Sequence, residues 1–131
     1  MSGNTTVVAD RPAPSSVVPG RVFPSRHLAR PGRRALVAAD LDDLRGPVGG
    51  TVELPIWLFW HPNRSFDLND TAIRRWVYQI VLREASRPED LTGYLNGEVL
   101  AGLWPDLRLP RGVRRAWEEQ HPSLAVTSAA A

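Results

Sequence analysis

The sequence predicts a small, mainly α-helical domain with one edge strand or extended segment and a disordered N-terminal arm. Apolar residues recur at helical spacing over residues 71–86, and proline and glycine divide the rest of the C-terminal half into short segments. Strand-like alternation is clear only in residues 51–60. Because 131 residues fit one domain with tails, we expect an arm at 1–33, an α-rich domain at 34–122 and a disordered tail at 123–131.

The N-terminal third predicts little regular structure before its first helix. Five prolines fall between Met1 and Gly32, and periodic apolar content is low, which is typical of an extended or disordered arm. Apolar residues in the string RALVAADLDDLRG, residues 34–46, then lie at helical spacing. Gly46-Pro47 would stop that helix.

Residues 51–60, TVELPIWLFW, predict a strand with two rather apolar faces. Alternation places one set on one face, namely Val52, Leu54, Ile56, Leu58 and Trp60, and the other set on the opposite face, namely Glu53, Pro55, Trp57 and Phe59. At least one of Trp57 and Phe59 is expected to be exposed. Pro55 lacks a backbone donor and favours an edge position. The pairing partners available in the sequence are short: Thr6–Ala9, Arg21–Phe23 and Leu107–Leu109. The free edge is therefore expected to be filled by the arm, by a second copy or by another protein.

Four helices are predicted after residue 70. Asp70, or Asn69, is the expected N-cap of a helix over 71–86, whose wide apolar face includes Trp76 and forms the centre of the core. Pro88 begins a helix to about residue 95, and Asn96-Gly97 is expected to cap its C-terminus. A short helix carries residues 99–104, and a last helix follows Pro110, with Val113, Ala116 and Trp117 inward and Pro122 at its end.

Composition excludes several chemistries. The chain has no Cys and no Lys, so disulfides, thiolate nucleophiles, cysteine-zinc sites, Schiff-base amines and the phosphate-loop lysine are ruled out. The sequence pI of about 9.9 accompanies a net charge of only +2, because few groups titrate between neutrality and the range of arginine. The positive charge is concentrated in residues 1–35, and no apolar run is long enough to span a membrane. We expect a cytoplasmic protein that does not bind membranes and needs no cofactor.

The segment from residue 57 to residue 70 holds the first candidate site. His61 lies within ten residues of Asn63, Arg64, Asp67 and Asp70, a set that would suit a general base or a metal ligand. His-Pro-Asn is also an ordinary turn sequence, and Asp70 is needed as a helix cap, so we favour a structural role for this cluster and expect neither catalysis nor metal binding. The side chains expected to contact a protein partner are Trp57, Phe59, His61 and Arg64.

Arginines at both ends of the domain form the second candidate site. Arg111, Arg114 and Arg115 have the spacing of one helix face, where they could contact phosphates or base edges. The arm would add its own cations, Arg30, Arg33 and Arg34 among them, along a groove of DNA. The competing interpretation is that Arg114 and Arg115 pair with Glu118 and Glu119 on a solvated helix.

Three strings resemble a known group of proteins. LPIWLFWHPNRSFDLND, RRWVYQIVLREA and LWPDLRLPRGVRRAWEE together look like short, uncharacterised actinobacterial proteins, over about residues 52–121. Members are sometimes labelled transcriptional regulators, and some are encoded beside nucleotidyltransferase-type toxins. The resemblance implies an antitoxin or regulatory role and brings no catalytic residue with it.

The function predicted from the sequence is therefore interaction without catalysis. We expect an adaptor or antitoxin-like regulator that binds a protein partner, either a toxin or a second copy of the chain, through residues 52–60 and the adjacent loop. The alternative is a DNA-binding transcriptional regulator that uses the Arg-rich arm and the last helix.

Overall fold

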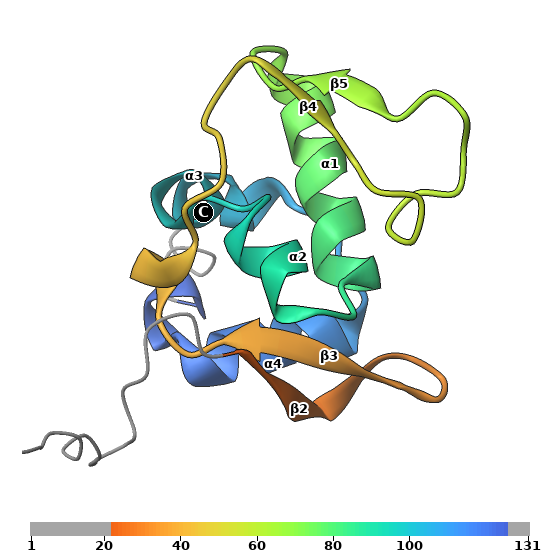
Figure 1. Ribbon diagram of the computed structural model, residues 1–131. Coiled ribbons are helices and arrows are strands. Elements are labelled where there is room, and N and C mark those ends of the chain that lie inside the picture. The colour runs from red at the N-terminus through yellow and green to blue at the C-terminus, as the bar shows by residue number, and fades with distance from the viewer. Residues whose placement is uncertain (1–21, 126–131) are drawn as a thin grey trace, which may run out of the picture.

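The computed structural model describes residues 22–125 and has a mixed α/β fold (Figure 1). The prediction of a mainly α domain is wrong, because two antiparallel two-stranded sheets flank the helices. One sheet pairs β2 (Val22–Arg30) with β3 (Arg33–Ala38), and the other pairs β4 (Thr51–Glu53) with β5 (Ser65–Asp67). Residues 1–21 of the predicted arm and residues 126–131 of the predicted tail lie outside the described part.

The β2–β3 hairpin replaces both the end of the predicted arm and the start of the first predicted helix. Ala35 and Val37 are buried at strand spacing, while Leu36 between them is only partly buried, so the periodicity of two prevails over the helical one. Pro31 and Gly32 form the turn, and Gly32 has a φ of 80° that suits glycine. The last prolines of the predicted disordered arm therefore lie in a hairpin. A short 3-10 turn, η2 (Leu41–Asp43), follows.

The predicted strand at 51–60 is shorter than expected. Of these ten residues, only the three of β4 pair as a strand. Their partner β5 is not among the pairing segments expected from the sequence. After Leu54 the chain turns, and the amide of Leu58 donates to the carbonyl of Pro55 at 3.0 Å. Residues 54–64, which we call the aromatic loop, thus connect the two strands of a hairpin. The edge of β4 toward β5 is filled by the chain itself.

The helices agree better with the sequence. α1 (Thr71–Glu84) begins at Asp70, whose carboxylate accepts from the amides of Ala72 and Ile73. α2 (Pro88–Thr92) has the predicted proline in its first turn, and α3 (Gly97–Leu103) follows. η3 (Trp104–Asp106) leads to α4 (Arg111–Gln120), where Val113, Ala116 and Trp117 are buried as predicted. A last helical turn at 122–125 follows His121.

Two details of the helix predictions are wrong. Asn96 caps the start of α3 rather than the end of α2, since its side-chain oxygen accepts from the amide of Val99 at 3.1 Å. Its own amide donates to the hydroxyl of Tyr78 on α1 at 2.9 Å, which fixes α3 against α1. Trp76, expected in the core, is 38% exposed.

The core lies between α1, the short helices and the β2–β3 hairpin. α4 packs along that hairpin at one end of the molecule, and β4 and β5 lie near the opposite end of α1 (Figure 1). Gly112 allows the close approach of α4, because a Cβ there would overlap the carbonyl oxygen of Leu28. The imidazole Nε2 of His121 donates to the carbonyl of Ala38 at 2.7 Å. The largest fully buried side chains include Trp104, Trp117 and Tyr78.

Candidate functional site

The base of the aromatic loop is closed by Arg64. Its Nε donates to the carbonyl of Leu54 at 2.9 Å, and its Nη1 donates to the carbonyl of His61 at 2.9 Å. Glu53 lies 3.7 Å from its Nη2. The amide of Leu54 also donates to the carbonyl of Arg64 at 2.9 Å. Arg64, predicted to contact a partner, is therefore occupied in joining the two ends of the loop.

Trp57 is held on α2 by a buried carboxylate. Its indole Nε1 donates to Asp90 Oδ1 at 2.9 Å, and the other oxygen of Asp90 accepts from the amides of Ser86 at 3.0 Å and Arg87 at 3.1 Å. The guanidinium carbon of Arg87 lies 4.0 Å from the centre of the Trp57 ring, on its face. Asp90 thus organises the start of α2 and fixes the middle of the loop at once.

Phe59 holds the loop on α1. Its ring meets the rings of Phe66 and Trp76 edge to face, at centroid distances of 5.7 Å and 5.1 Å, and Phe66 lies 5.1 Å from Trp76 in the same manner. On its other side Phe59 stacks with His61 at 5.7 Å. Phe59 is only partly exposed, so this predicted contact residue supports the loop rather than forming its outer surface.

The exposed side chains between residues 56 and 60 of the loop are apolar. Trp60 is 82% exposed and Ile56 and Trp57 are each 47% exposed. Together with Trp76 these residues form what we call the aromatic surface. The alternation of residues 52–60 groups Trp60 with Leu54 and Leu58, which are buried, and the expected exposed side chains are Trp57 and Phe59. The turn after Pro55 breaks that alternation, so the residue that protrudes most is missed by the sequence pattern. The sequence signal for this exposure is the string Trp60-His61-Pro62, in which an aromatic side chain stands at the start of a polar turn.

The polar cluster around His61 does not converge on one point. The Nδ1 of His61 accepts from the amide of Asn63 at 3.0 Å. Asp67 accepts from the amide of Asn69 at 2.9 Å, and Asp70 caps α1. Within residues 22–125, no group of three or more His, Cys, Asp or Glu side chains has an arrangement that could hold a metal ion. Each of these three side chains makes a contact within the loop or at the start of α1.

Several of the predicted nucleic-acid contacts are engaged within the fold. Arg30 pairs with the carboxylate of Glu84 at 3.3 Å, and Arg33 donates to the backbone carbonyl of the same residue at 3.0 Å. Arg114 donates to the carbonyl of Leu107, lies 3.5 Å from Glu118 and stands over the ring of Trp104. Arg33 and Arg114 are partly buried by these contacts, whereas Arg30 is exposed and paired. In the described part of the chain, Arg34, Arg111 and Arg115 are exposed and form no ion pair.

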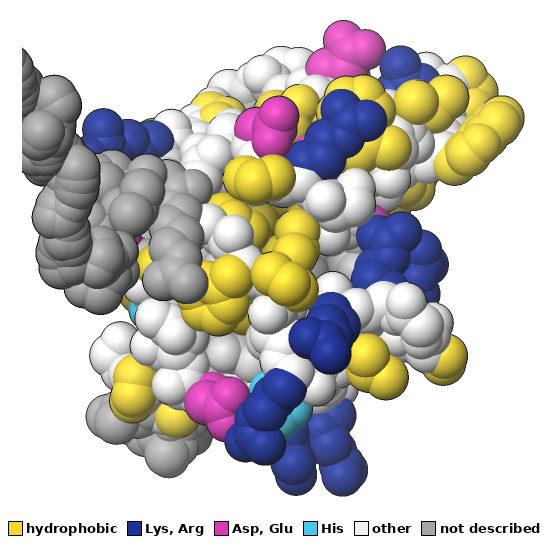
Figure 2. All heavy atoms as spheres, turned by 60° about the horizontal axis from the view of Figure 1, so that its bottom comes forward, with side chains coloured by type: hydrophobic (Ala, Val, Ile, Leu, Met, Phe, Trp, Pro, Cys, Tyr) yellow, Lys and Arg dark blue, Asp and Glu magenta, His cyan; other side chains and the backbone are white. Residues whose placement is uncertain are grey.

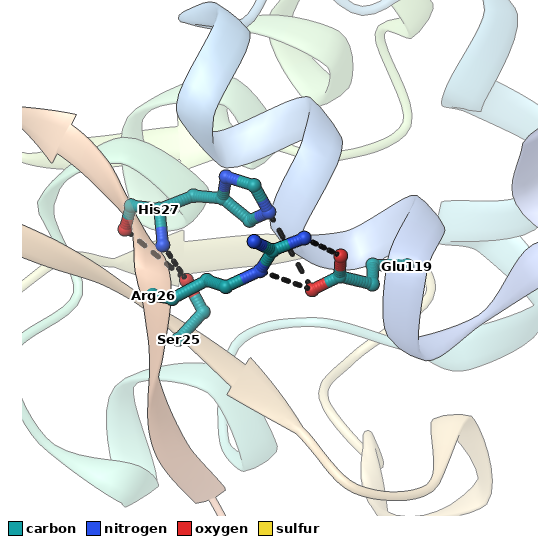
Figure 3. A network of polar contacts seen from close by, with 4 residues as sticks. All are labelled: Ser25, Arg26, His27 and Glu119. Carbon is teal, nitrogen blue, oxygen red and sulfur yellow. Dashed lines mark hydrogen bonds and ion pairs between the residues drawn. The ribbon is translucent and has the colours of Figure 1, made fainter.

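Acidic side chains interrupt the basic face formed by the β2–β3 hairpin and α4. Viewed from this side, Arg side chains are spread over the face with an acidic side chain and a histidine among them (Figure 2). The carboxylate of Glu119 on α4 pairs with the guanidinium of Arg26 on β2 at 2.6 Å (Figure 3). The same carboxylate lies 3.5 Å from the imidazole of His27. The hydrogen bond from Arg26 lowers the pKa of Glu119, so this carboxylate stays charged. The positive field of this face is therefore smaller than a count of its arginines indicates.

No protein-family model matches the sequence, and no significant match was found among curated proteins or solved structures. The resemblance of residues 52–121 to actinobacterial proteins thus stays a prediction. Among the helices of residues 22–125, none combines the length and the apolar character needed to cross a bilayer.

Proposed function

We propose that this chain is a non-catalytic interaction protein of the cytoplasm, and that its aromatic loop binds a protein partner. The observation that carries the proposal is the exposure of Trp60, 82%, on a loop whose ends and middle are hydrogen-bonded in place. Tryptophan is rarely left in water on a defined loop, and it is enriched among the residues that dominate protein interfaces.

The contacts behind the loop support the same proposal. Arg64 closes its base, Asp90 fixes Trp57 and Phe59 packs on Phe66 and Trp76. A surface that is ordered before binding loses less conformational entropy on association, so more of its contact energy appears as affinity. Adaptor and antitoxin-like roles are both forms of this proposal, and the antitoxin-like form is supported only by the resemblance described above.

The alternative proposal, a DNA-binding regulator, has a smaller set of residues to support it. Arg34, Arg111 and Arg115 remain exposed on the hairpin and α4, while Glu119 offsets Arg26 on the same face. This alternative predicts binding of duplex DNA that weakens steeply as salt is raised, and that is lost when the three exposed arginines are replaced.

A selection of random peptides tests the proposal and requires no candidate partner. Peptides displayed on phage are selected on the full chain and counter-selected on the Trp60→Ser variant. A matched control is Leu28→Ser, because Leu28 is 49% exposed on β2, outside the aromatic loop. We expect peptides that bind the wild type and the Leu28→Ser variant but not the Trp60→Ser variant. Peptides that bind all three proteins equally, or no selected peptides, would contradict the proposal.

A further inference from the structure

A groove lies beside the aromatic surface and shares Trp76 with it. It is formed by α1 and by the segment around the end of η3, and it is lined by Ala72, Arg75, Trp76, Gln79, Asp106 and Arg108. The ring of Trp76 contacts Phe59 and Phe66, each at a centroid distance of 5.1 Å. Trp76 therefore joins the groove to the aromatic side chains that hold the loop on α1.

The groove is rich in hydrogen-bond donors. The side-chain oxygen of Gln79 accepts from the backbone amide of Arg108 at 2.8 Å, which fixes the segment after η3 against α1. Among residues 22–125, the guanidinium groups of Arg75 and Arg108 form no hydrogen bond or ion pair. Asp106 is exposed and supplies the carboxylate of the groove. Two unpaired guanidinium groups against one carboxylate leave the groove cationic.

We infer that the protein partner of the proposed function presents an acidic segment with an apolar anchor. This inference rests on that function. An aromatic or branched side chain of the partner packs on Ile56 and Trp60, and an Asp or Glu carboxylate of the partner lies between Arg75 and Arg108. Guanidinium groups bind carboxylates in paired, directional hydrogen bonds.

A nucleic acid fits this surface less well than an acidic peptide. Two further cations at the aromatic loop are already engaged, since Arg64 lies beside Glu53 and Arg87 covers the ring of Trp57. A backbone of phosphates needs a continuous basic track, whereas a peptide needs one or two cations beside an apolar contact. Ile56 adds an aliphatic surface on which bases do not stack.

The test uses the peptides selected on the full chain. We expect them to be enriched in Asp or Glu together with Phe, Trp, Leu or Ile. The Arg75→Gln/Arg108→Gln double variant should bind them at least about tenfold more weakly, and replacing the peptide's acids by amides should have a similar effect. The control is Arg34→Gln/Arg115→Gln, which removes the same charge from the hairpin and α4 and should change affinity less than about twofold. Circular dichroism and urea midpoints of both double variants verify that they fold.

The outcomes separate the two proposals. Peptides that depend on Trp60 but carry no acidic bias, or that bind the Arg75→Gln/Arg108→Gln variant as tightly as the wild type, would overturn the acidic partner and leave the proposed function standing. Absence of any Trp60-dependent peptide would overturn the proposed function. A dimer in sedimentation that is lost in Trp60→Ser would identify a second copy as the occupant and overturn the acidic partner. Oligothymidine binding that is lost in Arg75→Gln/Arg108→Gln would do the same in favour of nucleic acid.

Discussion

Replacement of Asp90 by Ala should destabilise the domain and loosen the aromatic loop together. The carboxylate is 1% exposed and accepts hydrogen bonds from Trp57 Nε1 and from the amides of Ser86 and Arg87, at 2.9, 3.0 and 3.1 Å. Each bond contributes about 1 kcal/mol net, because part of its energy is regained from water when the bond is lost. Asp90→Ala should therefore lower the free energy of unfolding by about 3 kcal/mol.

A double-mutant cycle isolates the bond between the loop and α2. Trp57→Phe removes the indole donor and keeps an aromatic ring, and alone it should cost about 1 kcal/mol plus any lost packing. In the Asp90→Ala background the donor has no acceptor, so the same change should cost about 1 kcal/mol less. Urea unfolding of the four proteins, followed by far-ultraviolet circular dichroism, measures the coupling. Additive effects within about 0.3 kcal/mol would refute the claim that Asp90 fixes the loop.

The remaining predictions concern stability. Urea unfolding of Trp60→Ser should change the free energy of unfolding by less than about 0.5 kcal/mol, whereas Trp104→Ala, at a fully buried site, should cost about 3 to 5 kcal/mol; a large loss in Trp60→Ser would mean that Trp60 is a packing residue. Burial lowers the pKa of His121 in the folded chain, so the unfolded chain binds a proton first and stability should fall as pH drops below about 6.5. His121→Gln should flatten unfolding midpoints between about pH 5 and 7, and an unchanged slope would count against this assignment. Gly112→Ala should lower the free energy of unfolding by about 2 kcal/mol or more, because the added methyl group meets the backbone of β2. Gly102→Ala places its methyl group in open space and should stabilise α3 by about 0.5 to 1 kcal/mol. Equal urea midpoints for the two variants would refute the close contact at Gly112.

The helices of this fold could be predicted because their signals are local. Asp70 accepts hydrogen bonds from backbone amides that would otherwise be unpaired at the start of α1. Pro88 has no amide hydrogen to leave unpaired at the start of α2. Those features do not depend on the rest of the chain. Asn96-Gly97 is ambiguous because asparagine suits either end of a helix, and its bonds with Val99 and Tyr78 place it at the start of α3.

The strands could not be predicted because their pairing is not local. In residues 34–46 a helical and an alternating pattern coexist, and burial of Ala35 and Val37 in the core decides between them. The three residues of β5 carry too little pattern to reveal that they pair with β4. Prolines favour a prediction of disorder in the arm, although Pro31 occupies a hairpin turn.

The location of the candidate site could be predicted, but the roles of its residues could not. The apolar loop is expected from residues 52–60, and Trp57 is half-exposed there as proposed. Phe59 and Arg64 support the loop instead of forming its surface, and Trp60 protrudes because the turn after Pro55 reverses the expected facing. Such reversals depend on a hydrogen bond between residues three apart, which alternation does not encode.

The most direct test of the aromatic surface uses the five indole groups as reporters. The chain labelled with nitrogen-15 is titrated with a selected peptide that binds the wild type but not Trp60→Ser, and the indole N–H signals are followed by NMR. We predict the largest shifts at Trp60 and Trp76, which are 82% and 38% exposed, and unchanged signals from the buried Trp104 and Trp117. An unshifted Trp60 signal at saturation would contradict the proposal that this loop is the binding site.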